Sequence, residues 1–269
     1  MTQYLLRQNE RIDQLYSQNI SIIQSPEVFS FSLDAVLLAD FAKGPVKPTG
    51  QMVDLCAGNG AVGLFMAPKS RGHILMVELQ ERLADMAQRS VVLNHLDDRI
   101  DVLNRDLATI TDTIAKDSVD VVTCNPPYFA DLPSSKKNPN PYLAIARHEM
   151  TTNLTQIVMM TSDLLKMGGR AYFVHRPDRL LELTRELAEH RLSAKRVKFV
   201  YPKPGKPANM VLIEAIKDGK QTGLTVLPPL MTYGSDGHYS DEVRKMLYGN
   251  HHAEQNDWWL LFLRVILRG

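Results

Sequence analysis

The sequence predicts an α/β fold built around an open, mostly parallel sheet. From residue 50 onward, short apolar runs alternate with longer segments of helical spacing. Gly58, Gly60 and Gly63 stand between the first apolar run and the first helical segment, where folds of this class turn tightly beside a ligand. Glu78 and Asn125 stand at the ends of two further runs. Because parallel strands end at one edge of a sheet, we expect a ligand site at that edge.

The expected elements alternate between strand and helix along the chain. Strands are predicted over residues 52–56, 73–78, 100–103, 119–124, 170–175, 195–201 and 210–217. Helices are predicted over residues 61–69, 81–94, 154–167 and 177–190. Gly168-Gly169 is expected to stop the third helix, and Pro177 suits the first turn of the fourth, where its missing N–H costs nothing. The prediction is therefore a sheet of seven strands with helices on both faces.

The composition excludes several classes of protein. With 44% hydrophobic and 23% charged residues the chain is not disordered, and two cysteines among 269 residues exclude a disulfide-stapled scaffold. The net charge of +1 means that any nucleic-acid role depends on a local basic patch. No signal-peptide pattern opens the chain and no apolar run reaches the roughly 20 residues of a membrane span. We expect a cytoplasmic protein, with the short apolar stretch 258–267 forming a buried strand or terminal helix.

The glycine-rich turn and an acid beyond it indicate an adenosine-containing cofactor. Glu78 lies 20 residues after Gly58 and can accept two hydrogen bonds from a ribose diol. The glycine spacing also fits the NAD fingerprint, and an ordinary strand-to-helix turn would use the same glycines. Asp54 argues against NAD because dinucleotide-binding strands are usually apolar at that position. Its carboxylate can instead orient the loop, or meet a cationic amino-acid group through water.

Asn125-Pro126-Pro127-Tyr128 is the most specific motif in the chain, and it directly follows the predicted strand 119–124. Its two prolines fix the backbone and remove two N–H donors, which leaves carbonyl oxygens beside a carboxamide. Asn125 Oδ1 and the Pro126 carbonyl can each accept one N–H of an amino group, and Tyr128 can stack on a planar base. The alternative is a proline-stiffened turn, which the other residues at strand ends disfavour.

These motifs resemble class I S-adenosylmethionine-dependent amino-methyltransferases, and in particular the bacterial tRNA1(Val) adenine-37 N6-methyltransferase family. The turn after Asp54 is similar to motif I, and Asn-Pro-Pro-Tyr is similar to motif IV. Residues 30–41, 147–149 and 206–210 are also similar to that family, and the resemblance covers about residues 13–217. It implies a Rossmann-like class I methyltransferase fold, S-adenosylmethionine as cofactor and a tRNA substrate.

The resemblance also implies a division of the chain. Residues 1–48 are expected to form an N-terminal extension, a hairpin and a helix, packed on the catalytic domain of residues 49–220. Residues 221–269 are expected to form a C-terminal appendage. We expect a monomer or a weak dimer.

Cys56 and Cys124 are expected to be reduced core residues, and no cluster of Cys and His has the spacing of a metal site.

By this resemblance, Asp54 and the Gly58–Gly60 turn hold the methionine part of the cofactor, Glu78 holds the ribose and Asp106 the adenine amino group. A helix N-cap is an equally good interpretation of Asp106. The catalytic residues expected are Asn125, Pro126, Pro127 and Tyr128. The residues expected to bind the cofactor are Asp34, Asp54, Cys56, Ala57, Gly58, Asn59, Gly60, Glu78, Leu79, Asp106, Leu107 and Asn125.

A structured RNA is the expected substrate. Glutamine-modifying relatives carry a helical domain before motif I, whereas about 50 residues precede it here, and the chain has no surplus for a DNA target-recognition domain. Residues 166–206 hold eleven Lys and Arg against four Asp and Glu, which favours phosphate contacts, although charged runs are often only solvated faces. The residues expected to bind substrate are Tyr128, Phe129, Lys136, Lys137, Arg147, Arg196, Lys198, Lys203 and Lys206.

The expected reaction is methyl transfer to the exocyclic N6 of an adenosine in tRNA, by resemblance at position 37 of a valine tRNA. The alternatives are methylation of a protein glutamine or of another RNA or DNA amino group, a non-catalytic RNA-binding protein with this fold, and an NAD-binding dehydrogenase. No metal is required, and His148 is given no catalytic role because the methylated ammonium product loses its proton readily.

Overall fold

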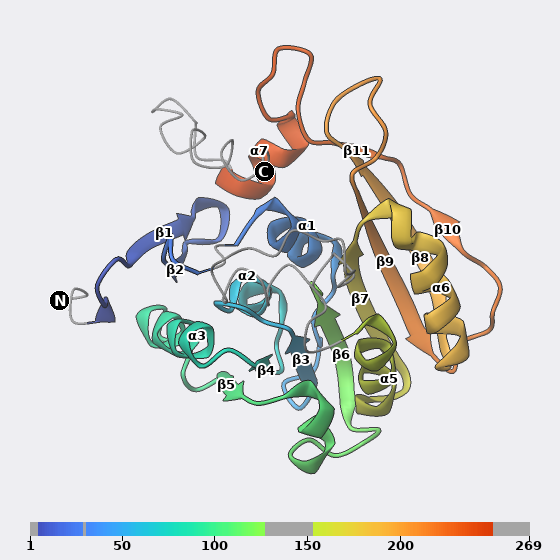
Figure 1. Ribbon diagram of the computed structural model, residues 1–269, viewed down its shortest axis with the longest axis horizontal. Helices are drawn as coiled ribbons and strands as arrows, with labels where there is room; N and C mark the ends of the chain where they lie inside the picture. Colours follow the sequence, from blue (N-terminus) through green and yellow to red (C-terminus); the bar gives the residue numbers. More distant parts are fainter. Residues whose placement is uncertain (1–4, 29–30, 127–152, 250–269) are drawn as a thin grey trace, which may run out of the picture.

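The computed structural model describes residues 5–28, 31–126 and 153–249. A nine-stranded sheet crosses the molecule in the order β10-β8-β9-β7-β6-β3-β4-β5, with β11 also paired to β8 (Figure 1). Its seven long strands are those predicted from the sequence, and they are β3 (Gln51–Leu55), β4 (His73–Glu78), β5 (Ile100–Asn104), β6 (Val119–Cys124), β7 (Leu165–His175), β8 (Leu192–Tyr201) and β9 (Met210–Lys217).

The predicted helices are present with small changes at their ends. They are α2 (Ala61–Met66), α3 (Glu81–Leu93), α5 (Leu154–Leu164) and α6 (Leu180–Glu189). The structure also contains α1 (Leu33–Phe41) and α7 (Asp241–Tyr248). A short 3₁₀ turn over Ala67–Lys69 extends α2, and another over Pro177–Arg179 precedes α6. Pro177 therefore opens a 3₁₀ turn, which tolerates the missing N–H for the same reason as the first turn of an α-helix.

The sheet is mostly parallel, as predicted. The strands β3 to β7 pair with one another in parallel, whereas β9 lies antiparallel between β7 and β8. The predicted count of seven strands is too low because the C-terminal segment adds β10 (Thr225–Val226) and β11 (Leu230–Met231), both parallel to β8. Each has only two residues, too short a run to give a recognisable hydrophobic period.

The predicted helix end at Gly168-Gly169 is wrong. The helix α5 ends at Leu164, and β7 begins at Leu165 and runs for 11 residues through both glycines. Gly168 has φ +77°, and the register of β7 against β6 shifts between Val119 and Val121. The glycines therefore allow a bulge in a strand, a role that depends on the neighbouring strand and has the same local signature as a helix stop.

Hydrophobic cores lie on both faces of the sheet because successive strand residues point to opposite sides. Met52 and Tyr172 pack with the core of α1, α2 and α3, whereas their neighbours Val53 and Phe173 pack with the core of α5 and α6. The two helical layers lie on either side of the strands in Figure 1. The prediction of helices on both faces is confirmed.

The ends of the described chain pack onto the first of these layers. The hairpin of β1 (Arg11–Leu15) and β2 (Ile20–Gln24) is tied to α3, where the backbone N–H of Ile23 donates to Ser90 Oγ at 2.9 Å. Tyr16, after β1, stacks on Tyr248 of α7 with ring centroids 6.3 Å apart. The N-terminal and C-terminal segments thus meet over α1, on the side seen at the top of Figure 1.

Candidate active site

The carboxyl ends of β3, β4, β5 and β6 meet at one edge of the sheet because the four strands are parallel neighbours. The glycine turn follows β3, Glu78 ends β4, Asp106 follows β5 and Asn125 follows β6. The residues predicted at strand ends are therefore brought to a single edge, where open α/β sheets bind their ligands.

The turn after β3 needs glycine at two positions. Gly58 has φ +59° and Gly60 has φ +86°, a region that side chains with a Cβ rarely adopt. Gly60 N–H donates to the carbonyl of Ala57 at 2.9 Å, and Ala57 N–H donates to Val77 of β4 at 3.0 Å. A Cβ built on Gly58 would meet nothing within 4 Å, so a ligand can approach this stretch of backbone directly.

Gly63 has a different task, in the first turn of α2. A Cβ there would lie 2.4 Å from Met76 Sδ, on the neighbouring strand β4. The helix can lie this close to the sheet only because the side chain is a hydrogen.

Asp54 orients the turn from within the sheet. Its side chain is nearly fully buried, with 1% of its surface exposed. Oδ2 accepts the backbone N–H of Gly63 at 3.1 Å, and Oδ1 accepts the hydroxyl of Thr123, on β6, at 2.7 Å. Burial raises the pKa of Asp54 to about 7. The bond to Gly63 shows that this carboxylate helps to orient the start of α2 after the glycine turn, and Thr123 is a partner that sequence reasoning missed.

Glu78 links β4 to the glycine turn. Its Oε2 accepts the backbone N–H of Gly58 and its Oε1 that of Gln80, both at 2.8 Å. The residue is 6% exposed, and burial raises the pKa of its carboxyl group. The backbone N–H of Leu79 also contributes, and because a carboxylate has about four acceptor positions, the group can accept a further hydrogen bond from a ligand hydroxyl.

Other residues predicted to bind the cofactor make contacts of their own within the protein. Asn59 Nδ2 donates to the carbonyl of Ile23 at 3.1 Å, so its side chain fastens the turn to β2. Asp34 Oδ1 accepts the backbone N–H of Ala35 at 2.9 Å and the Ser32 hydroxyl, at the start of α1. Leu79 is exposed beside Glu78. These contacts leave the backbone of the turn, rather than the Asn59 amide, open to a ligand.

Asp106 caps the 3₁₀ helix Leu107–Asp112, where its Oδ1 accepts the backbone N–H of Ala108 at 2.8 Å. The N-cap interpretation is thus confirmed. The residue is also exposed, while Leu107 beneath it is buried, so the carboxylate is available to a ligand at the end of β5. The two interpretations of Asp106 are compatible with each other.

The Asn-Pro-Pro-Tyr motif is described only in its first half. Asn125 is half-buried and Pro126 is buried, directly after β6 and between the ends of β3 and β7. The predicted site residues Pro127, Tyr128, Phe129, Lys136, Lys137 and Arg147 lie outside the described residues, as do residues 133–141 and 258–267.

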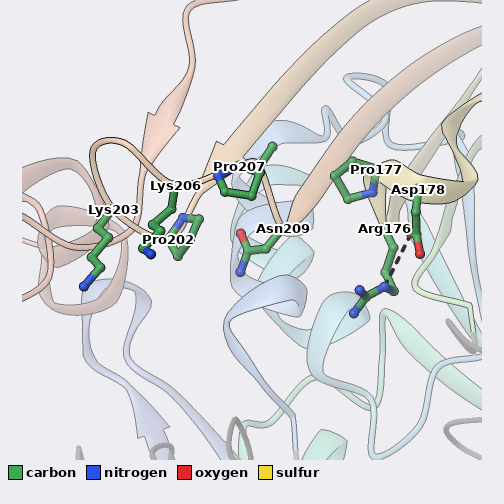
Figure 2. Close-up of a pocket in the computed structure, with 9 residues that line it drawn as sticks. Arg176, Pro177, Asp178, Pro202, Lys203, Lys206, Pro207 and Asn209 are labelled. Atoms are coloured by element: carbon green, nitrogen blue, oxygen red, sulfur yellow. Dashed lines mark ion pairs between the residues drawn. The ribbon is translucent and has the colours of Figure 1, made fainter.

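The predicted basic residues fall into two groups. Arg196 and Lys198 lie within β8 and have carboxylate partners: Arg196 is 2.9 Å from Glu214 and Lys198 is 2.8 Å from Glu242. Lys203 and Lys206 lie in the loop from β8 to β9, at the edge that also carries Asn125, and line a pocket there (Figure 2). Two residues that sequence reasoning missed, Arg176 and Asn209, line the same pocket; their signal was adjacency to the predicted strands 170–175 and 210–217.

The two cysteines end neighbouring strands, as expected. Cys56 has φ +56° and is half-buried, and Cys124 is buried beside it; both are free thiols. Burial raises the pKa of the Cys124 thiol, which favours its protonated form. Within residues 5–28, 31–126 and 153–249, no group of three or more His, Cys, Asp and Glu is placed to hold a metal ion. In the same part of the chain, no helix is long and apolar enough to cross a membrane.

Residues 19–153 match the family model of the methyltransferase small domain, which is half of the chain. The chain belongs to this family. It is a class I methyltransferase that depends on S-adenosylmethionine. The match spans the glycine turn, Glu78, Asp106 and the Asn-Pro-Pro-Tyr motif, so the whole predicted cofactor edge lies inside it.

Curated relatives give the same class. The methyltransferase is 28% identical over 215 residues to a tRNA1(Val) (adenine(37)-N6)-methyltransferase of Bacteroides thetaiotaomicron, covering 79% of this chain and 86% of that protein. It is 26% identical over 217 residues to a protein of the same name from Shewanella sp. (strain MR-4), covering 79% and 87%.

Solved structures share the fold. A predicted O-methyltransferase of Agrobacterium tumefaciens superposes with a TM-score of 0.63 at 22% identity, covering 80% of this chain and 96% of that one. Geranyl diphosphate C-methyltransferase of Streptomyces coelicolor A3(2), solved with S-adenosyl-L-homocysteine, gives 0.51 at 17% identity, covering 68% and 74%. The prediction of a Rossmann-like class I methyltransferase fold is confirmed.

The geometry of the edge fits S-adenosylmethionine. The open backbone at Gly58 can receive the amino-acid part, and Glu78 retains acceptor positions for ribose hydroxyls. Asp106 exposes a carboxylate one strand further along, where an adenine amino group can donate to it. These are residues that would hold the cofactor.

Proposed function

We propose that this methyltransferase modifies the exocyclic N6 of an adenosine in tRNA, and that the target is adenosine 37 of a valine tRNA. The observation that carries the proposal is Asn125-Pro126 at the end of β6, next to the β3 end that bears the glycine turn. An amino group held by these acceptors would lie beside the cofactor edge. The names of the curated relatives support adenine 37 as the target, and a tRNA substrate implies a cytoplasmic enzyme.

The chemistry needs placement more than acid or base. When bound, S-adenosylmethionine supplies an electrophilic methyl group. Asn125 Oδ1 and the Pro126 carbonyl accept the two N–H groups of the adenine amine, which turns the nitrogen lone pair out of conjugation with the base. Tyr128, following the second proline, stacks on the unstacked base. Fixing two reacting centres in line accounts for a large rate gain without a general base.

The first test is the substitution Asn125→Ala. It removes one acceptor of the amino group, so methyl transfer to tRNA is expected to fall at least about a hundredfold, the usual effect of deleting one positioned hydrogen bond at a reacting centre. The dissociation constant of S-adenosylmethionine is expected to change little. Methyl transfer at the rate of the unaltered enzyme would refute the role of Asn125.

The second test identifies the substrate class. Labelled S-adenosylmethionine is incubated with the enzyme and separate pools of tRNA, ribosomal RNA and protein, and nucleosides from labelled RNA are analysed by mass spectrometry. The proposal predicts N6-methyladenosine in tRNA, lost from tRNA of a strain that lacks the gene. Label in protein glutamine would replace the proposal with its main alternative.

A further inference from the structure

A pocket of about 530 Å³ opens between the turn after β7 and the loop that joins β8 to β9 (Figure 2). It lies at the substrate edge of the sheet, because β7 and β8 end there and β9 begins there, with His175 opposite Val211 and Val200 opposite Met210. The pocket is lined from the turn by Arg176, Pro177 and Asp178, and from the loop by Pro202, Lys203, Lys206, Pro207, Ala208 and Asn209.

The charges of the pocket favour an anion. Arg176, Lys203 and Lys206 bring three positive charges, whereas Asp178 brings one negative charge and lies 3.4 Å from Arg176. Lys203 and Lys206 are exposed, and no carboxylate in the described part of the chain forms an ion pair with either. Their charge is therefore available to a ligand phosphate, unlike that of Lys198, which Glu242 neutralises.

The rest of the pocket is apolar and stiff. The rings of Pro177, Pro202 and Pro207 form its walls, and proline fixes its own φ angle, so these walls exist before a ligand binds. Figure 2 shows Lys203 and Lys206 on one side, Pro177 on the other, and Asn209 with its amide group between them. A side-chain amide beside flat apolar walls suits the edge of a nucleobase.

The order of the strands gives the distance between this pocket and Asn125, where the reacting amino group is proposed to bind. The strands β7, β9 and β8 follow β6 across the sheet, and neighbouring strands lie ~4.8 Å apart. The start of β9 is thus roughly 10 Å, and the end of β8 roughly 15 Å, from the end of β6 that carries Asn125. A nucleotide adjacent to one held at Asn125 would reach this part of the edge.

We propose that the pocket binds a nucleotide flanking the target adenosine on the same RNA strand, with its phosphate at Lys203 and Lys206 and its base among the prolines beside Asn209. This inference rests on the proposed function. It assigns to the β8–β9 loop the task of selecting a polynucleotide over a free nucleoside, because only a strand supplies the flanking phosphate.

The test compares a double variant with a matched control. Lys203→Ala/Lys206→Ala removes both lysine charges from the pocket, and Lys220→Ala removes one exposed lysine near the far end of β9, at the opposite edge of the sheet. With a tRNA anticodon stem-loop as substrate, KM is expected to rise about tenfold for the double variant and to stay unchanged for the control. The slope of log KM against log salt should fall by about 0.7, the value for one lost phosphate contact on a single strand.

Two further measurements make the test more specific: a variant that conserves the positive charges, and a modified substrate. Lys203→Arg/Lys206→Arg should keep KM near that of the unaltered enzyme. In a stem-loop whose flanking phosphodiesters are replaced one at a time by uncharged methylphosphonate, one replacement should raise KM for the unaltered enzyme and have no further effect on the alanine variant. Equal KM values for the double variant and the Lys220 control, or additive effects of variant and methylphosphonate, would overturn the inference.

The same experiment tests the proposed function by a different measurement, which is the formation of N6-methyladenosine by the unaltered enzyme. If the unaltered enzyme forms N6-methyladenosine in the stem-loop while the pocket variants behave like the control, the proposed function stands and only the pocket assignment is lost. If the unaltered enzyme does not methylate any tRNA, both are lost.

Discussion

The turn after β3 and the loop between β8 and β9 lie at the same edge of the sheet but are organised in opposite ways. Around the first, polar groups are buried and joined to one another: Asp54 holds Gly63, and Glu78 holds Gly58. In the second, Lys203 and Lys206 are exposed. The first arrangement is rigid before a ligand arrives and suits one small molecule, whereas the second offers charge to a flexible polyanion.

The difference teaches where the specificity of each region comes from. Around the turn after β3, backbone conformation and burial decide which ligand fits. A single added carbon or a changed carboxylate there should therefore have a large effect on stability or on cofactor binding. In the substrate half, the available charges decide, so the effect of a basic residue depends on whether a carboxylate of the protein already neutralises it. Substitutions at Asp54, at Gly58 and Gly63, and at Lys198 test this contrast.

The largest effect is expected for Asp54, through the pH dependence of stability. Burial raises its pKa to about 7, whereas the unfolded chain keeps a value near 3.9. Between about pH 4 and pH 7 the folded state therefore binds a proton that the unfolded state has released, so the free energy of unfolding falls as pH rises through this window and levels off above it. The total loss is at most about 4 kcal/mol.

Urea denaturation of the unaltered protein and of Asp54→Asn, from pH 4.5 to pH 8, measures this loss. The variant lacks the titrating group, so its stability should fall less steeply. Glu78, whose pKa burial also raises, titrates in both proteins, and its charge raises the pKa of Asp54, so the difference between the two curves includes this interaction. Parallel curves would show that Asp54 ionises in the folded state as easily as in the unfolded chain.

Intermediate effects are expected at Gly58, in the turn after β3, and at Gly63, in the first turn of α2. Gly63→Ala puts a Cβ 2.4 Å from Met76 Sδ, so overpacking should cost about 1–3 kcal/mol of stability. Gly58→Ala meets no neighbour, so it should cost only the left-handed backbone energy, roughly 1–2 kcal/mol, but should weaken S-adenosylmethionine binding by filling the open space over the turn.

A second substitution separates the two mechanisms. Met76→Ala removes a buried side chain and destabilises the protein by itself, so the cost of each glycine substitution is compared with and without it. In the Met76→Ala background, Gly63→Ala should cost less stability than in the unaltered protein, because the colliding side chain is gone, whereas Gly58→Ala should cost the same. Thermal unfolding measures these costs, and calorimetric titration measures cofactor binding. An unchanged cost of Gly63→Ala in the Met76→Ala background would contradict the packing argument.

The sequence was informative wherever a local conformation demands a particular residue. The positive φ angles of the turn favour glycine, and the sequence has Gly58 and Gly60 at these positions. The close approach of α2 to β4 requires a residue without a side chain, and the sequence has Gly63 there. Cys56 is the exception, since a left-handed residue with a side chain leaves no such signal. Gly168 was misassigned because a strand bulge and a helix stop both use a left-handed glycine, and only pairing with β6 distinguishes them.

The basic patch was less predictable because its meaning depends on distant partners. A count over residues 166–206 treats all lysines and arginines alike. Arg196 forms an ion pair with Glu214, which also pairs with Arg170, and Lys198 forms one with Glu242, 44 residues further along the chain. Glu242 belongs to α7, in a segment where the sequence predicted only an appendage. Charge counting therefore located the basic region but could not separate structural cations from available ones.

The smallest effect is expected for Lys198→Ala, which tests that separation directly. Lys198 has 18% of its side chain exposed and lies 2.8 Å from Glu242, so removing it should cost no more than about 1 kcal/mol of stability, the usual range for such an ion pair. Its effect on KM for the RNA should stay under about twofold, against about tenfold for Lys203→Ala/Lys206→Ala, because its charge is already neutralised.

Glu242→Gln provides the matched control for this last substitution, since it releases the Lys198 charge without changing its position. KM for the stem-loop should then fall or stay unchanged, and the salt slope should not decrease. If Lys198→Ala instead raised KM as much as the loop variant, ion pairing within the protein would not decide which cations serve the substrate. The contrast between the two basic groups would then reduce to their distance from the reacting edge.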